Sequence, residues 1–325
     1  RIWCSDLEQF VVVITVAAFL LAPIAVEMLM EKITKKNMFF VFGGVPFDVV
    51  FREGKFRANG PFRHPILAGT VGATCLPLFI GLWKRNRTAS VVGIASALTM
   101  TFTCASSGPI MSAMAGVFAV VMWRFRDLAK LARAAAVAGY IAFTILTGEP
   151  GYYIMKRIDL SGGSTGYFRA RLIESSIEHL GEWWLFGTDI TRHWMPTGVS
   201  SSPNHTDITN YYLGFGVTAG LIAIVILLIM LALAFKWVGV FCRSNLGDHP
   251  DDSFMVWCLG AGMFAHAVTS ISVAYFDQSY LFFWLNLAII SSVCWSRSAA
   301  PESSTDPNSW NSEGDQTGSV LDRGR

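Results

Sequence analysis

The residues best suited to chemistry lie in a polar stretch of roughly sixty residues, 149 to 209, between two long apolar parts of the chain. It carries Arg169, Arg171 and, near its end, His205 and Asp207. A neutral imidazole can take a proton from a hydroxyl group as a general base, and a carboxylate partner raises its basicity and fixes its tautomer. At a spacing of two residues, Asp207 reaches His205 only if the backbone turns. Glu174 and Glu178 are alternative partners, and a solvated loop histidine without a partner is the plainer interpretation.

A second set of candidates lies directly before an apolar run. Arg57, Arg63 and His64 fall within eight residues, beside Gly60 and Pro61, which favour a turn. Arginine presents a planar fork of donors that stays charged and matches phosphate oxygens two at a time. These residues therefore favour contact with a phosphate or pyrophosphate at the membrane surface. The alternative is that interfacial arginines simply extend toward lipid headgroups.

The composition indicates the class of protein that must position these residues. Hydrophobic residues make up 53% of the 325 residues and charged residues 15%, and the apolar residues come in blocks. This pattern is typical of an all-α polytopic integral membrane protein, since a spanning helix needs about 20 apolar residues. We expect eight spans: Gln9 to Met30, Pro65 to Trp83, Ala89 to Cys104, Pro109 to Trp123, Leu128 to Gly148, Asn210 to Phe235, Phe254 to Phe276 and Tyr280 to Ser296.

Positive charge in the short connectors predicts the orientation. The connectors expected in the cytoplasm contain Lys84, Arg85, Arg87, Arg124, Arg126, Lys130, Arg133, Lys236 and Arg243. Both long loops, 31–64 and 149–209, then lie outside, and both ends of the chain lie inside. The loop 31–64 is rich in lysine and arginine, against the rule for short loops. In an alternative topology, Met38 to Phe51 also crosses and returns its lysines to the cytoplasm.

The sequence therefore divides into four parts. Residues 1–148 form the N-terminal spans, with the basic loop 31–64; residues 149–209 form the outer loop; residues 210–296 form the C-terminal spans; and 297–325 form a disordered cytoplasmic tail. In the outer loop, Tyr167 to Trp184 has the spacing of an amphipathic surface helix, with Gly162, Gly163 and Gly166 as a hinge before it. Because the chain opens on Arg1 directly before a span, further helices are expected upstream.

No Cys/His spacing typical of a metal site and no disulfide framework is found, so no cofactor or metal is expected. Of the other histidines, His179, His193 and His249 are expected to be solvated, and His266 to be hydrogen-bonded inside its span. Glu27 is the only carboxylate within an expected span, near its outer end.

Taken together, the chain resembles the O-antigen ligase and polymerase family of bacterial membrane glycosyltransferases, from about Glu27 to Trp295. Four stretches carry the resemblance: Glu31 to Asn37 followed by Phe39; Arg57 to Gly69, with Gly-Pro-Phe-Arg-His-Pro; Tyr167-Phe168-Arg169 running to Leu185-Phe186-Gly187; and Asn204-His205-Thr206-Asp207 to Leu213, then Gly216 and Gly220. Two departures from the family pattern are Thr206 directly after the histidine and Gly220 one place late. A third is the absence of an arginine from Ser106-Ser107-Gly108.

The resemblance implies an enzyme of the bacterial cytoplasmic membrane that transfers a glycan from undecaprenyl pyrophosphate to a saccharide or lipid-linked acceptor on the outer face. It implies no metal and no nucleic-acid partner. Arg63 and Arg169, with Arg57 and Arg171, would hold the pyrophosphate, and His205 would activate the acceptor hydroxyl. By the same resemblance His64, Asp207 and Asn210 are expected to line the substrate site. The alternatives are a transporter or flippase, and transfer of the glycan to a protein hydroxyl.

Overall fold

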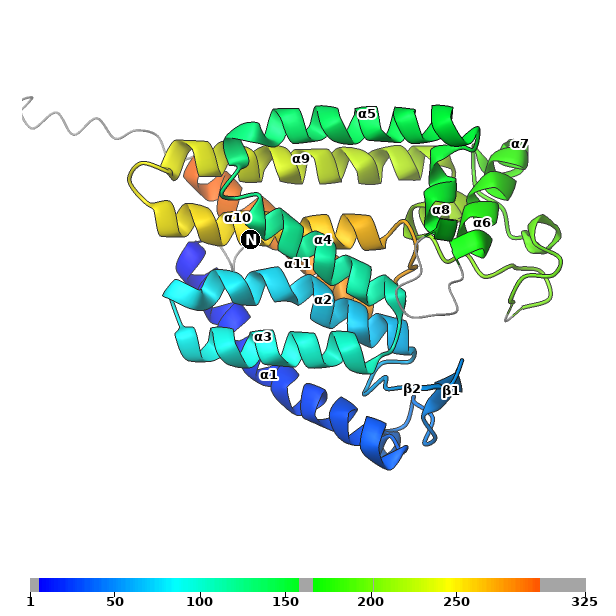
Figure 1. Cartoon of the computed structure of the whole chain (residues 1–325), viewed down its shortest axis with the longest axis horizontal. Coiled ribbons are helices and arrows are strands. Elements are labelled where there is room, and N and C mark those ends of the chain that lie inside the picture. Colours follow the sequence, from blue (N-terminus) through cyan, green and yellow to red (C-terminus); the bar gives the residue numbers. More distant parts are fainter. Residues whose placement is uncertain (1–5, 158–165, 201, 299–325) are drawn as a thin grey trace, which may run out of the picture.

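The computed structural model describes residues 6–157, 166–200 and 202–298, and they are mostly helical (Figure 1). The α-helices are α1 Leu7–Thr34, α2 Pro65–Gly81, α3 Arg87–Thr103, α4 Ser107–Val121, α5 Ala129–Thr147, α6 Gly166–Glu178, α7 Leu180–Trp183, α8 Tyr211–Ala219, α9 Leu221–Asn245, α10 Pro250–Thr269 and α11 Ser279–Ser298. Short 3-10 helices are η1 Met38–Phe42, η2 Leu82–Lys84, η3 Arg126–Leu128, η4 Gly151–Arg157 and η5 Arg192–Trp194. The strands β1 Val50–Arg52 and β2 Lys55–Arg57 form an antiparallel hairpin, with Phe51 opposite Phe56.

Among the described residues, three helical stretches are long and apolar enough to cross a membrane: Leu7–Thr34, Pro65–Lys84 and Leu221–Asn245. Shorter apolar helices cover Ser107–Val121, Ala134–Thr147 and Ser279–Cys294. These helices are compatible with a membrane protein.

The burial of α1 and α2 differs in a way that fits this class. Along α1 the buried residues form a single stripe with helical spacing, including Phe10, Ile14 and Leu21, whereas Val12 and Leu20 on the other faces are exposed. The helix α2 is buried on almost every side and packs against α3, α4 and α10. The outer helix α1 thus exposes apolar side chains, whereas the inner helix α2 is enclosed by other helices. This arrangement is expected where the surroundings are lipid rather than water.

Helices occupy the positions of the expected spans, with two differences. The stretch Asn210 to Phe235 is not one continuous helix, because it breaks at Gly220 into α8 and α9, and α9 continues to Asn245. The helix at the seventh expected span, α10, ends at Thr269 rather than Phe276. The helix α11 ends at Ser298, inside the predicted disordered tail, and residues 299–325 of that tail lie outside the described residues.

The break at Gly220 is the point where the outer loop joins the helices. Gly220 has φ +82°, and a Cβ on it would lie 2.2 Å from the carbonyl oxygen of Leu185; a Cβ on Gly187 would lie 2.3 Å from that of Val217. The same two segments exchange main-chain bonds, since Leu221 N–H donates to Trp184 O at 2.7 Å and Thr188 N–H to Val217 O at 2.8 Å. Both glycines are therefore required by a close approach of two backbones.

The loop 31–64 does not contain the alternative span across Met38 to Phe51. That segment forms η1, a turn and strand β1, none of which is long enough to cross a membrane. The loop is fixed at its base by Glu31, whose carboxylate accepts the backbone N–H groups of Asn59 and Gly60, the latter at 2.9 Å. It is also held by Lys32, which donates to Phe56 O at 2.5 Å.

In the long loop, Tyr167 to Trp184 forms two helices rather than one. The helix α6 ends at Glu178, and α7 starts after His179. Of the three glycines expected to act as a hinge, Gly166 is the first residue of α6, while Gly162 and Gly163 lie outside the described residues. Figure 1 shows β1, β2, α6 and α7 at the same end of the helix bundle, so parts of both long loops lie at that end. Elsewhere Arg85 joins Glu8 at 2.8 Å and Asp252, which ties the starts of α1 and α10 to the end of η2.

Candidate functional site

Arg57 lies at the end of β2 and is almost fully buried. Its Nε donates to the carbonyl oxygen of Cys104 at 3.3 Å, and the backbone N–H of Ala58 donates to Thr103 O at 3.2 Å. Burial is the main cause that lowers the pKa of Arg57, with a further contribution from the nearby Arg52. An arginine still keeps its charge under these conditions. The bundle therefore holds a buried cation at the base of the hairpin.

His64 and Arg63 have different environments although they are adjacent. His64 is the N-cap of α2, and its Nδ1 accepts the backbone N–H of Ile66 at 3.2 Å. Burial, and then the charges of Arg57 and Arg52, lower the pKa of His64 to about 4. The ring is thus a neutral helix cap near the arginines. Arg63 is largely exposed, with its Nη1 3.9 Å from the carboxylate of Asp277.

Arg169 comes from the long loop, on α6, and lines a cavity of about 130 Å³. The cavity lies between the start of α4, at Ser107 and Gly108, and the end of α10, at Thr269. The Nε of Arg169 is buried and has no hydrogen-bond partner within the described residues. A cavity of this size holds several water molecules, so Arg169 borders room for a small polar group.

The arginines of the two loops are close enough to influence one another. Burial lowers the pKa of Arg169, and the charges of Arg52 and Arg57 lower it further, whereas Asp207 acts in the opposite direction. Two acids offset part of this charge, since Glu53 lies 3.2 Å from Arg52 and Asp207 acts on Arg169, so the three arginines retain an excess of one positive charge. Like charges repel at short range, and an anion bound between them offsets this repulsion by its attraction to each cation. The arrangement therefore favours an anionic ligand.

Of the carboxylates considered as partners of His205, Asp207 does not pair with it in the described part of the chain. Among the described residues no hydrogen bond joins the two side chains, and the imidazole of His205 is exposed. The backbone of Asp207 instead donates to Val199 O at 2.9 Å, and its carboxylate interacts with Arg169. Desolvation raises the pKa of Asp207, and Arg169 acts to lower it. Glu174 and Glu178 do not replace Asp207 as partners of His205, because Arg171 takes both.

Arg171 and Asn210, predicted to bind substrate, already have internal partners. Arg171 forms ion pairs with Glu174 and, at 3.4 Å, with Glu178 on its own helix. Asn210 caps α8 by accepting the N–H of Leu213 at 3.0 Å, and its Nδ2 donates to Ile271 O at 2.9 Å. The Arg171 pairs brace α6, and the Asn210 bonds fix the start of α8, so both side chains have a structural role.

Other residues of this site were not singled out from the sequence. Arg52 adds a cation near Arg57 and Arg169, and its position at a strand end is not visible as a motif. Ser106 is the N-cap of α4 and its side chain makes no capping hydrogen bond, and Ser107 and Gly108 of the first turn line the cavity. The sequence did contain one signal for this helix start, Ser-Ser-Gly-Pro directly after an apolar run.

The prediction for His266 is confirmed, because its Nδ1 hydrogen-bonds the Tyr275 hydroxyl at 2.9 Å.

Compared with known proteins, the chain matches no family model, and no curated protein is significantly similar to it.

Proposed function

We propose that this protein is a polytopic membrane glycosyltransferase that transfers a glycan from a lipid pyrophosphate carrier, of the undecaprenyl type, to an acceptor hydroxyl. The observation that carries the proposal is Arg169, whose buried Nε has no hydrogen-bond partner in the described part of the chain, and which lines a cavity and lies near Arg57 and Arg52. An arginine fork beside a helix N-terminus is a favourable site for phosphate oxygens. The motifs that resemble the O-antigen ligase and polymerase family support the same assignment.

The reaction that fits is a displacement at the anomeric carbon of the donor sugar. The acceptor oxygen forms a bond to that carbon, the bond from the carbon to the pyrophosphate oxygen breaks, and the acceptor proton passes to a base. The lipid pyrophosphate leaves with the electron pair, and its negative charge is stabilised by Arg57, Arg169 and the first N–H groups of α4. Stabilisation of developing charge by preorganised donors is usually the largest contribution to catalysis of this kind.

His205 is the proposed base. Its imidazole is exposed and unpaired among the described residues, and the neighbouring Asn204 is held to the start of η5, where the N–H groups of Thr191 and Arg192 donate to its carbonyl oxygen at 2.9 and 3.0 Å. A neutral imidazole offers a lone pair that can accept a proton without a carboxylate partner. Arg63, exposed at the edge of the cluster, would contact the outer part of the donor.

In this proposal the eight apolar helical segments cross the bacterial cytoplasmic membrane, and the end that carries β1, β2, α6 and α7 faces outward. The exposed apolar faces of α1 and α9 support this topology. The basic loop 31–64 then lies outside, where its Arg57 and Arg63 bind the pyrophosphate. Cysteine labelling at the exposed positions 63 and 205 tests the topology, and labelling from opposite sides of the membrane would contradict it.

The activity is tested by measuring glycan transfer from a lipid pyrophosphate donor in proteoliposomes. Arg169→Ala, Arg63→Ala and His205→Ala are each expected to abolish the product while expression in the membrane is retained. Arg124→Ala, at an exposed arginine in the turn before η3, is the matched control and should keep full activity. Full activity in the three site variants would refute the assignment, and sugar uptake without a covalent product would indicate a transporter.

A further inference from the structure

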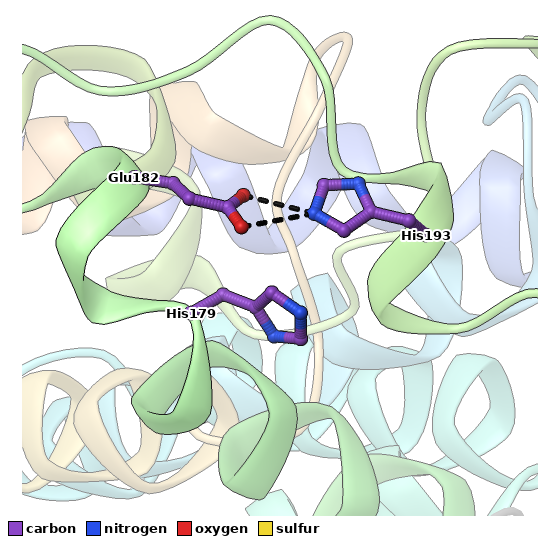
Figure 2. A group of neighbouring side chains, drawn as sticks. All are labelled: His179, Glu182 and His193. Carbon is purple, nitrogen blue, oxygen red and sulfur yellow. Dashed lines mark hydrogen bonds and ion pairs between the residues drawn. The ribbon is translucent and has the colours of Figure 1, made fainter.

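Three side chains of the long loop converge although they are separated in sequence. His179 lies between α6 and α7, Glu182 lies on α7, and His193 lies on η5. Their ligand atoms, two imidazole nitrogens and a carboxylate oxygen, all lie within 4.8 Å of one another. Figure 2 shows the carboxylate of Glu182 directed at the ring of His193, with the ring of His179 beside this pair. These histidines were expected to be solvated, and the spacing of three and eleven residues is not a sequence motif for a metal.

The hydrogen bond of His179 determines which of its nitrogens is available. Its Nδ1 lies 2.9 Å from the carbonyl oxygen of Ser175. A carbonyl oxygen only accepts, so Nδ1 carries the proton and the Nε2 of the neutral ring presents a lone pair. Metal-binding histidines usually donate their second ring nitrogen to a carbonyl or carboxylate in this manner, which fixes the ring and its tautomer.

Glu182 is oriented in a similar way. The indole Nε1 of Trp194 donates to Glu182 Oε2 at 3.0 Å, and the ring of Trp194 stacks on His179 with centroids 5.7 Å apart. His193 Nε2 lies 2.9 and 3.0 Å from the two carboxylate oxygens. The carboxylate is therefore held from one side by a neutral donor and faces both imidazoles with its other side.

We infer that His179, Glu182 and His193 form a binding site for a divalent transition metal ion, with zinc as the ion that best fits two imidazoles and a carboxylate. Magnesium and calcium prefer oxygen ligands, whereas imidazole suits zinc and its neighbours. Zinc lies about 2.0 to 2.2 Å from such ligands, which places tetrahedral ligand atoms about 3.3 Å apart. The widest separation has to shrink by about 1.5 Å, a change within reach of side-chain rotation at this exposed surface. In the metal-bound form, the ion takes the place of the proton between His193 and Glu182.

The position of the site indicates a structural rather than a catalytic role. His179 follows Arg169 by ten residues, about 15 Å along a helix axis, so the metal is remote from the arginine cluster. The metal site joins the α6–α7 corner to η5. Thr191 and Arg192, at the start of η5, in turn hold Asn204 through two main-chain hydrogen bonds. Metal binding would therefore order the loop between α6 and α8. The inference is independent of the proposed transferase activity.

The test uses the full chain purified in detergent through a tag without histidine, treated with a chelator and then dialysed against zinc sulfate. We expect the bound zinc to reach one ion per chain. His179→Ala and His193→Ala are each expected to weaken binding by about tenfold or more. His249→Ala changes an exposed histidine in the α9–α10 turn and serves as the matched control, with no loss expected.

Measurements on the unaltered chain test the metal site even where a variant does not fold. Zinc should slow hydrogen–deuterium exchange in residues 179–194, and bound cobalt should give the visible absorption of a site with four or five ligands. Equal zinc binding by the folded His179→Ala and His193→Ala variants would overturn the inference. So would an unaltered chain that binds no zinc or shows unchanged exchange in this segment.

Discussion

The Nε of Arg57 donates to the carbonyl oxygen of Cys104 at 3.3 Å, which attaches the β-hairpin to the C-terminal end of α3. The two terminal nitrogens of Arg57 have no hydrogen-bond partner among the described residues. The side chain therefore uses one donor for its own position and keeps the planar fork for a ligand. This relationship makes a conservative substitution informative.

Arg57→Lys keeps the positive charge but removes both the bond to Cys104 and the fork. We expect glycan transfer to fall by roughly 10²-fold, the loss typical for removal of a preorganised donor. The measurement is the initial rate in proteoliposomes, with Arg124→Lys as the control. Unchanged transfer by Arg57→Lys would mean that charge alone suffices at this position.

Asp207→Asn removes the acid that faces Arg169. Because a carboxylate near the arginines weakens their attraction for an anion, the substitution should tighten binding of inorganic pyrophosphate, and Arg169→Ala should weaken it. Both effects should diminish in high salt, which screens exposed charges. Calorimetric titration with pyrophosphate measures them. Weaker binding by Asp207→Asn would assign Asp207 a direct role in holding the ligand.

His64→Asn tests a pH effect on stability. The pKa of His64 falls from 6.5 to about 4 on folding, so between these values the unfolded chain binds more protons than the folded one. Stability therefore rises with pH across this window and is lost on acidification from 6.5 toward 4. Asparagine is a good N-cap that does not titrate in this range.

The measurement for His64→Asn is the melting temperature at pH 7 and pH 5. The unaltered chain should lose more of its melting temperature on acidification than the variant does. Equal losses would show that His64 does not contribute to the pH dependence, since the remaining titratable groups are common to both proteins.

Gly220→Ala is expected to destabilise the junction of α8 and α9. The residue has φ +82°, and a Cβ would lie 2.2 Å from Leu185 O, so strain of the order of 1 to 3 kcal/mol and a displaced loop should result. Gly214→Ala is the control: its Cβ would meet no atom within 4 Å, and alanine favours the helix. Thermal unfolding measures both, and similar melting temperatures would contradict the steric argument.

The helices could be predicted from the sequence because blocks of about twenty apolar residues are a strong signal. The break at Gly220 could not, since hydropathy does not report a backbone angle or the approach of the chain at Leu185. The expected surface helix was also too long, because its periodicity continues through His179 although the helix ends at Glu178.

The site was predictable only in part, because residue type can be read from the sequence but the pairing of charges cannot. Arginine type and position before an apolar run indicated Arg57, and the arginine-led helix indicated Arg169, but the sequence did not show which cations lack partners. Arg171 is neutralised by Glu174 on the same helix, whereas Arg169 has no such acid. His179 and His193 come together only through a chain reversal between α7 and η5, which no local pattern encodes.

The joint between the long loop and α9 consists of main-chain bonds at Trp184 and Val217 and of two glycines. Because main-chain atoms form these bonds, they do not depend on which side chains the neighbouring residues carry. Exposed side chains of this loop that join neither the metal site nor these bonds, such as Val199, can therefore be exchanged while the register of the loop against α8 and α9 stays constant.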